Sequence, residues 1–277
     1  MSTKVAVVTG SNKGIGLAIV RALCGQFQGD VYITARDEGR GREAAASLAS
    51  DGLTAMFHQL DINDLSSVRA AAAFFKDKYG GVDVLVNNAG IAFKGSDNTP
   101  FAVQADVTLK TNFFATRDVL THFLPIVKAG GRVVNVSSFV GAQALSRCSP
   151  ALQQRLRSED VTEDELAALM QQFVDKSKTA EHEQAGWPET AYGVSKTGLT
   201  VRSTDPSDGR VRKPGSCLQM SQRVWIEMLH LNEKFLFVCF LDAVDDPGSS
   251  SVQGETERGV TTETQQLIIN RQTKNIR

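Results

Sequence analysis

This chain of 277 residues has few cysteines, almost no net charge and no long apolar run. Its four cysteines show no C-x-x-C spacing, and so few thiols are typical of a reducing compartment. Thirty basic against thirty-one acidic residues give a net charge of −1, which offers no electrostatic footprint for nucleic acid or an anionic membrane. The apolar run at residues 235–241 is far too short to span a membrane. With 42% hydrophobic residues and no signal-peptide layout at residues 1–4, the chain is expected to be a globular cytoplasmic protein.

The chain instead contains short apolar runs separated by intervals of helix length. They are rich in Val, Ile and Leu without strict alternation, the pattern of strands buried on both faces of a parallel sheet. The runs are residues 5–9, 31–34, 55–60, 82–87 and 132–137. Because the intervals fit βαβ crossovers, the sequence predicts an α/β fold with a doubly wound parallel sheet, Rossmann-like in kind.

A glycine-rich turn follows the first run, before a helix predicted at residues 16–27. The turn consists of Gly10, Ser11, Asn12, Lys13, Gly14, Ile15 and Gly16. Gly10 allows a sharp exit from the strand, whereas Gly14 and Gly16 let a pyrophosphate approach the amides at the positive end of the helix. The spacing is not the commoner G-x-G-x-x-G, and such a loop alone can be a simple turn. Its place between a strand and a helix favours dinucleotide binding.

The residues after the second run bear on the choice between the two nicotinamide cofactors. NAD-binding domains often have an acidic residue here, whereas this chain has Arg36 directly after Ala35. The guanidinium of Arg36 can pair with a 2′-phosphate, and Lys13 can add a second positive charge. This favours NADPH. In the alternative, Arg36 is a solvated surface residue and Asp37 holds the ribose.

Three residues in the middle of the chain suggest carbonyl chemistry. Tyr192 and Lys196 are four apart, so on a helix they share a face and the ammonium can approach the phenol. A free tyrosine with a pKa of about 10 is a reluctant acid at neutral pH, and a nearby cation would lower that pKa. Ser138 follows a predicted strand and can hydrogen-bond a substrate carbonyl. Tyr192 would then supply the proton for a hydride transfer.

Residues 1–200 resemble the short-chain dehydrogenase/reductases, and within them the monomeric NADPH-dependent carbonyl reductases. The resemblance rests on the order and spacing of the glycine loop, Asp61-Ile62, Asn87-Asn88-Ala89-Gly90, Asn112, Ser138 and Tyr192-Gly193-Val194-Ser195-Lys196. It implies one dinucleotide-binding and catalytic domain over residues 1–200, followed by a divergent tail at residues 201–277.

The resemblance also implies roles for individual residues. Asp61 and Ile62 would flank the adenine, and Asn88 would lie beside the cofactor. Tyr192 and Lys196 would also contact the cofactor, Lys196 at the nicotinamide ribose. Asn112 would support a water-linked proton path. The substrate pocket would comprise Phe93, Gln104, Ser138 and Trp187, although Phe93 and Trp187 could equally belong to the core. No metal is implied.

The interval at residues 139–191 is longer than in the shorter family members. Thr162 followed by Glu165 indicates a capping box, and Leu166, Leu169, Met170 and Phe173 form a helical stripe. This resembles the helical insertion of monomeric carbonyl reductases, which covers a surface that relatives use for oligomer contacts. A monomer is therefore expected. In the alternative, the helix packs locally with no bearing on assembly.

Residues 201–277 depart from the family pattern. Pro206 lies in a loop-like stretch and should cut the Tyr192 helix short, and Pro214-Gly215 follows no buried strand. Residues 222–231 are weakly helical. The run at 235–241 could serve as a strand or remain exposed, and the polar residues 242–277 are expected to be disordered. The sheet is thus expected to be incomplete on its C-terminal side.

Three functions stay open at this point. The first is NADPH-dependent reduction of ketones, aldehydes and quinones to alcohols, with competence in question because of the altered tail. The second is an inactive protein that keeps a nucleotide-binding or interaction surface. The third is an NADP-dependent alcohol dehydrogenase of the same family. The expected partner is a small carbonyl compound rather than nucleic acid or membrane.

Overall fold

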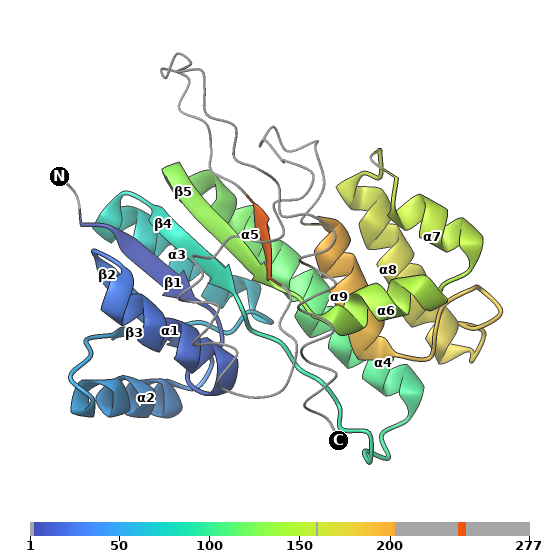
Figure 1. Ribbon diagram of the computed structural model, residues 1–277, viewed down its shortest axis with the longest axis horizontal. Helices are drawn as coiled ribbons and strands as arrows, with labels where there is room; N and C mark the ends of the chain where they lie inside the picture. The colour runs from blue at the N-terminus through green and yellow to red at the C-terminus, as the bar shows by residue number, and fades with distance from the viewer. Residues whose placement is uncertain (1–2, 159, 203–237, 242–277) are drawn as a thin grey trace, which may run out of the picture. The chain divides into compact units, whose positions relative to one another are not determined.

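The computed structural model describes residues 3–158, 160–202 and 238–241. Its parallel strands run in the order β3-β2-β1-β4-β5 (Figure 1). Their bounds are β1 (Val5–Val8), β2 (Asp30–Ala35), β3 (Met56–Gln59), β4 (Val82–Asn87) and β5 (Val127–Val136). All five predicted strands are confirmed. β5 begins five residues before its predicted start at Arg132, because Val127 already pairs with Val82 of β4.

Two helices cover each face of this sheet. α1 (Gly14–Gln26) and α2 (Glu38–Ser50) pack on one face, and α3 (Leu65–Tyr79) and α5 (Thr116–Phe123) pack on the other. Successive strand residues point to opposite faces, so Val7 packs with α3 and α5 whereas Val8 packs with α1 and α2. Burial on both faces explains why the strands read as continuous apolar runs.

The long interval at residues 139–191 builds a third core. It contains α6 (Phe139–Arg147), α7 (Pro150–Leu156) and α8 (Glu163–Lys178), which group with α4 (Phe101–Leu109), the π-helix η1 (Lys110–Ala115) and α9 (Ala191–Arg202) (Figure 1). A short 3₁₀ turn, η2 (Leu124–Ile126), leads into β5. Thr162 caps α8 by accepting from Glu165 N, as predicted. Of the predicted stripe, Leu166, Met170 and Phe173 are buried in this core, and Leu169 packs against it.

A short sixth strand, β6 (Val238–Leu241), pairs antiparallel with β5. The predicted doubly wound parallel sheet is confirmed over its five parallel strands, and the run at 235–241 contributes an additional strand over four residues. The expectations for Pro206, Pro214-Gly215, residues 222–231 and residues 242–277 lie outside the described residues. No described helix combines the length and apolar composition needed to cross a bilayer.

Candidate active site

The loop between β1 and α1 requires glycine at three places. Gly10 and Gly14 have φ angles of +60° and +57°, in the left-handed region that favours glycine. A Cβ on Gly10 would lie 2.8 Å from Cα of Ala89, and one on Gly16 would lie 2.5 Å from Nδ2 of Asn88. The glycines therefore allow the loop to turn sharply and to approach the end of β4, while their contact with a cofactor stays a prediction.

Asn88 and Ser11 brace this loop from two sides. Nδ2 of Asn88 donates to the carbonyl of Thr9 at 2.9 Å. Oγ of Ser11 donates to the carbonyl of Val8 at 2.8 Å and accepts from N of Thr34 at 3.1 Å. Ser11 is fully buried. The Ser11 hydroxyl thus ties the loop to β1 and β2, and the contact of Ser11 with the cofactor stays a prediction.

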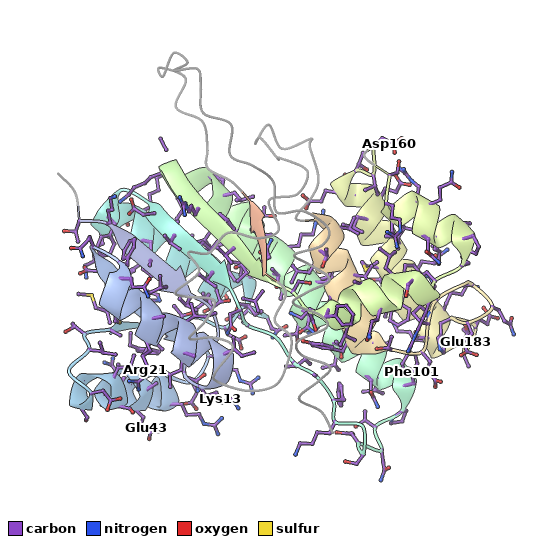
Figure 2. The ribbon with its side chains drawn as sticks, viewed as in Figure 1. Lys13, Arg21, Glu43, Phe101, Asp160 and Glu183 are labelled. Carbon is purple, nitrogen blue, oxygen red and sulfur yellow. The ribbon has the colours of Figure 1, made fainter. Side chains whose placement is uncertain are left out.

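The first turn of α1 has the properties of an anion site. Lys13 precedes the helix, and its side chain makes no capping hydrogen bond to the first-turn N–H groups. Such groups at the positive end of a helix dipole bind phosphate readily. Lys13, Gly14 and Ile15 are exposed, and Asn12 is half-buried. Figure 2 labels Lys13, which lies where the loop enters α1. The predicted pyrophosphate cradle fits this geometry.

Arg36 and Asp37 are exposed directly after β2. Oδ1 of Asp37 accepts from N of Arg40 at 2.8 Å and thereby caps α2. This bond places the carboxylate at a helix end, which weighs against the alternative in which Asp37 binds the ribose. Arg36 and Lys13 are the cations that fit a 2′-phosphate.

Asp61 and Ile62 follow β3. Oδ1 of Asp61 accepts from N of Asn63 at 3.0 Å, which forms a tight turn, and Ile62 is buried against the α3 side of the core. Both residues lie past the carboxyl end of a parallel strand, as the glycine loop does, and ligands of such sheets bind at this edge. Their place beside the adenine stays a prediction.

Ser138, Tyr192 and Lys196 come together where β5 meets α6 and α9. Ser138 is the N-cap of α6, and its hydroxyl lies near enough to the phenol of Tyr192 to influence the pKa of that phenol. Nζ of Lys196 lies 5.7 Å from the centre of the Tyr192 ring, so both side chains occupy one face of α9, as predicted. Nζ of Lys196 also donates to the carbonyl of Val136 at 2.7 Å. The three predicted residues thus form one cluster.

The acidity of Tyr192 differs from the expectation. Burial raises the pKa of its phenol above the ordinary value, and the neighbouring Ser138 hydroxyl opposes this rise only in part. The predicted lowering of the pKa is therefore wrong for this structure, because burial outweighs the opposing effect. A phenol with a raised pKa stays protonated at neutral pH, which suits a proton donor.

Asn112 lies in η1, and its side chain acts as a brace. Nδ2 donates to the carbonyl of Ile91 at 2.9 Å and to Oγ of Ser195 at 3.0 Å, and Oδ1 accepts from N of Ile91 at 2.8 Å. Oγ of Ser195 in turn donates to the carbonyl of Tyr192 at 2.8 Å. The side chain of Asn112 thus reaches the backbone of Tyr192 through Ser195, while its proton-path role stays a prediction. π-turns of this kind are frequent at functional sites.

This site can now be set beside known proteins. The family model for short chain dehydrogenases matches residues 4–150. The chain belongs to the short-chain dehydrogenase family. Carbonyl reductase [NADPH] 1 of Bos taurus is 60% identical over 202 residues, which cover 73% of each chain. The protein of the same name from Homo sapiens is 60% identical over 199 residues, 72% of each chain. Among solved structures, menthone neomenthol reductase from Mentha piperita has 27% identity and a TM-score of 0.65, covering 73% of this chain and 84% of its own.

The predicted substrate pocket of this short-chain dehydrogenase is only partly supported. Trp187 is buried against Phe173, with ring centres 5.6 Å apart, which favours the alternative that it belongs to the core, while its pocket role stays a prediction. Nε2 of Gln104 donates to the carbonyl of Thr99 at 2.8 Å, which braces the segment before α4. Phe93 is half-buried. Its place in the pocket stays a prediction.

Sequence reasoning missed an apolar surface beside Ser138. Phe139 and Val140 are large apolar residues at the start of α6, and they are 42% and 37% exposed. Their position directly after Ser138 was the available signal, because residues next to a catalytic strand end usually face the substrate. Within the described ranges, no group of three or more His, Cys, Asp or Glu residues could hold a metal ion.

Proposed function

We propose that this short-chain dehydrogenase is an NADPH-dependent carbonyl reductase that converts ketones, aldehydes and quinones to alcohols. The observation that carries the proposal is the cluster of Ser138, Tyr192 and Lys196 at the carboxyl end of β5. The relatives named carbonyl reductase [NADPH] 1 support the reaction and the cofactor.

The residues present fit the dinucleotide. The uncapped first turn of α1 suits the pyrophosphate, and Arg36 and Lys13 suit the 2′-phosphate. When bound, NADPH supplies the hydride. The carboxylate of Asp37 caps α2 and is therefore held at the start of that helix. Arg36 is then the residue directly after β2 that suits the 2′-phosphate.

The chain's own residues manage the proton and the carbonyl oxygen. The Ser138 hydroxyl orients the substrate carbonyl by a hydrogen bond, and the Tyr192 phenol donates its proton to the carbonyl oxygen as the carbon is reduced. The phenolate left on Tyr192 is stabilised by the ammonium of Lys196, which already lies over its ring. Lys196 also holds the end of β5 through Val136 and is proposed to contact the nicotinamide ribose.

Two alternatives are weaker. Alcohol oxidation needs Tyr192 as a base, whereas burial raises the pKa of the phenol and keeps it protonated at neutral pH. An inactive nucleotide-binding protein would not need Ser138, Tyr192 and Lys196 in contact, yet the structure brings them together. The relatives named carbonyl reductase [NADPH] 1 favour reduction over both alternatives.

The assembly and compartment are part of the same proposal. α8 packs on α4 and α9, and Arg117 of α5 pairs with Glu163 at 2.7 Å and with Asp164 at 3.1 Å. The insertion thus covers surface of α4 and α5, which supports a monomer. Cys24 and Cys148 are free thiols, which supports a cytoplasmic protein. The division into a catalytic domain at 1–200 and a tail at 201–277 is proposed from sequence.

The test is NADPH oxidation by the full chain with a small quinone, followed by absorbance, with Tyr192→Phe as the matched variant. We expect turnover by the parent chain and its near loss in the variant, while both bind NADPH. Absent turnover with intact NADPH binding would favour the inactive alternative. Faster NADP reduction with an alcohol than NADPH oxidation with the quinone at neutral pH would favour the dehydrogenase alternative.

A further inference from the structure

α6 and α9 approach each other at small residues next to the catalytic cluster. A Cβ added to Gly141 of α6 would lie 2.8 Å from the carbonyl carbon of Lys196 and 2.9 Å from N of Thr197. One turn away, a Cβ on Gly193 of α9 would lie 2.8 Å from Cβ of Ala144. These distances are shorter than real side-chain contacts allow, so the two helix backbones touch at this seam only because both glycines lack a side chain.

A buried hydrogen bond crosses the same seam. Oγ1 of Thr197 donates to the carbonyl of Gly141 at 2.7 Å, with the carbonyl of Gly193 as a second acceptor at 3.1 Å. Threonines inside helices usually bond back to their own helix, so the shorter bond to the neighbouring helix is a specific link. Thr197 is 2% exposed, and water has little access to replace this bond.

The two residues that this hydrogen bond joins are each close in the chain to a proposed reacting group. Gly141 lies in the first turn of α6, and its N donates at 2.9 Å to the carbonyl of Ser138, the residue that caps the helix. Thr197 follows Lys196 on α9, and Gly193 follows Tyr192. A shift of α6 along or away from α9 would therefore move the Ser138 hydroxyl relative to the Tyr192 phenol.

We infer that Gly141 and Thr197 are positioning residues that hold the Ser138 hydroxyl beside the Tyr192 phenol. The inference rests on the proposed function of that cluster. A methyl group on Gly141 meets backbone atoms rather than a flexible side chain, so the helices must separate to accommodate it. Displacements of about 1 Å in a reacting group can lower rates by about a hundredfold. The separation would also move the Ser138 hydroxyl away from the Tyr192 phenol, whose pKa that hydroxyl lowers.

The test uses the full chain with Gly141→Ala, Thr197→Val and Thr197→Ser. We expect Gly141→Ala to lower kcat for quinone reduction by at least about tenfold and Thr197→Val to lower it by a smaller factor, since one bond is lost without a clash. Thr197→Ser keeps the hydroxyl and should stay near the parent. All three variants should still bind NADPH, because the glycine loop and Arg36 are unaltered. Gly25→Ala is the matched control, because a Cβ there meets nothing within 4 Å.

Two readouts separate positioning from a merely structural role. In a double-mutant cycle, Gly141→Ala should lower kcat far less in a Ser138→Ala background, because the residue through which it acts is already absent. Ultraviolet titration should place the Tyr192 phenol at a higher pH in Gly141→Ala than in the parent. The Tyr192 signal is isolated by subtracting the Tyr192→Phe spectrum, since the chain has three tyrosines.

Each outcome decides the matter. Full additivity in the cycle, or a parent-like kcat and phenol titration in Gly141→Ala, overturns the inference. If Gly141→Ala does not fold, equal activity of Thr197→Val and Thr197→Ser overturns it, and loss in the valine variant alone supports it. If Tyr192→Phe retains turnover, the proposed catalytic cluster fails instead. If the parent chain has no turnover, the phenol titration alone decides the positioning role.

Discussion

Nδ2 of Asn112 donates to Oγ of Ser195 at 3.0 Å and so joins the π-turn η1 to the helix that carries Tyr192 and Lys196. The same amide makes two bonds with the backbone of Ile91, at the segment that follows β4. One buried side chain therefore connects three segments that meet at the proposed catalytic cluster. The role of Asn112 is first structural, whatever it contributes to proton transfer.

Asn112→Ala should destabilise the fold strongly. The change leaves the N–H and C=O of the half-buried Ile91 without their partner, and an unpaired group costs about 1 to 3 kcal/mol when it is fully buried and less when water can reach it. We expect the free energy of unfolding to fall by about 2 to 4 kcal/mol in denaturant titrations. Asn98→Ala, at an exposed position, is the control and should change it little. Equal stability of the two variants would contradict the brace.

Arg36→Ala should weaken the preference for NADPH over NADH. Arg36 and Lys13 are exposed cations beside the proposed phosphate site, and each charge-assisted contact is worth about 1.5 to 3 kcal/mol. The parent should prefer NADPH by about tenfold or more, and each alanine variant should lose most of that factor. Fluorescence titration with both cofactors measures it. Arg157→Ala is the matched control, because Arg157 is exposed on the insertion. If Arg36→Ala keeps the same preference for NADPH as Arg157→Ala does, Arg36 does not bind the 2′-phosphate.

Tyr192→Phe should lower quinone reduction by on the order of a hundredfold or more, because the ring stays and the transferable proton is lost. The pH profile carries a further expectation. A proton donor loses activity as the pH rises through its pKa, and burial raises the pKa of Tyr192 above its ordinary value of about 10. The rate should therefore show no alkaline fall from this group until above about pH 10. A tyrosine-dependent fall near neutral pH would contradict the raised pKa.

The sequence predicted the five parallel strands and the glycine loop because both depend on local patterns. A strand buried on both faces needs a continuous apolar run, and Gly10, Gly14 and Gly16 meet steric demands that only glycine satisfies. The first half of β5 was missed because Lys128 and Gly130 break the apolar pattern. That half is held by pairing with β4, which no local signal reports.

The proposed catalytic residues lie together as their spacing predicts, but their environment was not predicted. Spacing placed Tyr192 and Lys196 on one helix face, whereas the pKa of Tyr192 depends on burial by segments far away in the chain. Ser11 looked like a cofactor contact because it lies in the glycine loop, yet its hydroxyl is used within the fold. Tertiary contacts decide such roles, and one sequence does not contain them as a pattern.

Stability at high pH should depend on Tyr79. Its phenol donates to Oδ2 of Asp30 at 2.5 Å and contacts the hydroxyl of Tyr32 at 3.0 Å. Burial is the largest cause that raises the pKa of Tyr79 well above its ordinary value, and the hydrogen bonds with Asp30 and Tyr32 raise it further. The stabilisation is fully present below the unfolded pKa of about 10 and is lost as the pH rises toward the folded pKa.

Tyr79→Phe should therefore be less stable than the parent at neutral pH and should show a smaller loss of stability above about pH 10. Denaturant midpoints measured across neutral to alkaline pH test this. Tyr192→Phe is the comparison, since it removes a different phenol whose pKa is also raised. If the parent and Tyr79→Phe lose stability in parallel above pH 10, the bond to Asp30 does not carry the linkage.

Ala180→Gly should stabilise the insertion. Ala180 follows α8 with a φ of +58°, and it is the only non-glycine residue with a positive φ in the described ranges. A left-handed alanine costs about 1 to 2 kcal/mol, whereas the extra freedom of glycine in the unfolded chain offsets about 0.5 to 1 kcal/mol. The expected net gain is up to about 1 kcal/mol in the free energy of unfolding. Ala46→Gly is the matched control, because it lies exposed inside α2 and should lose about 1 kcal/mol. If both glycine variants are destabilised alike, the left-handed conformation at Ala180 does not strain the native chain.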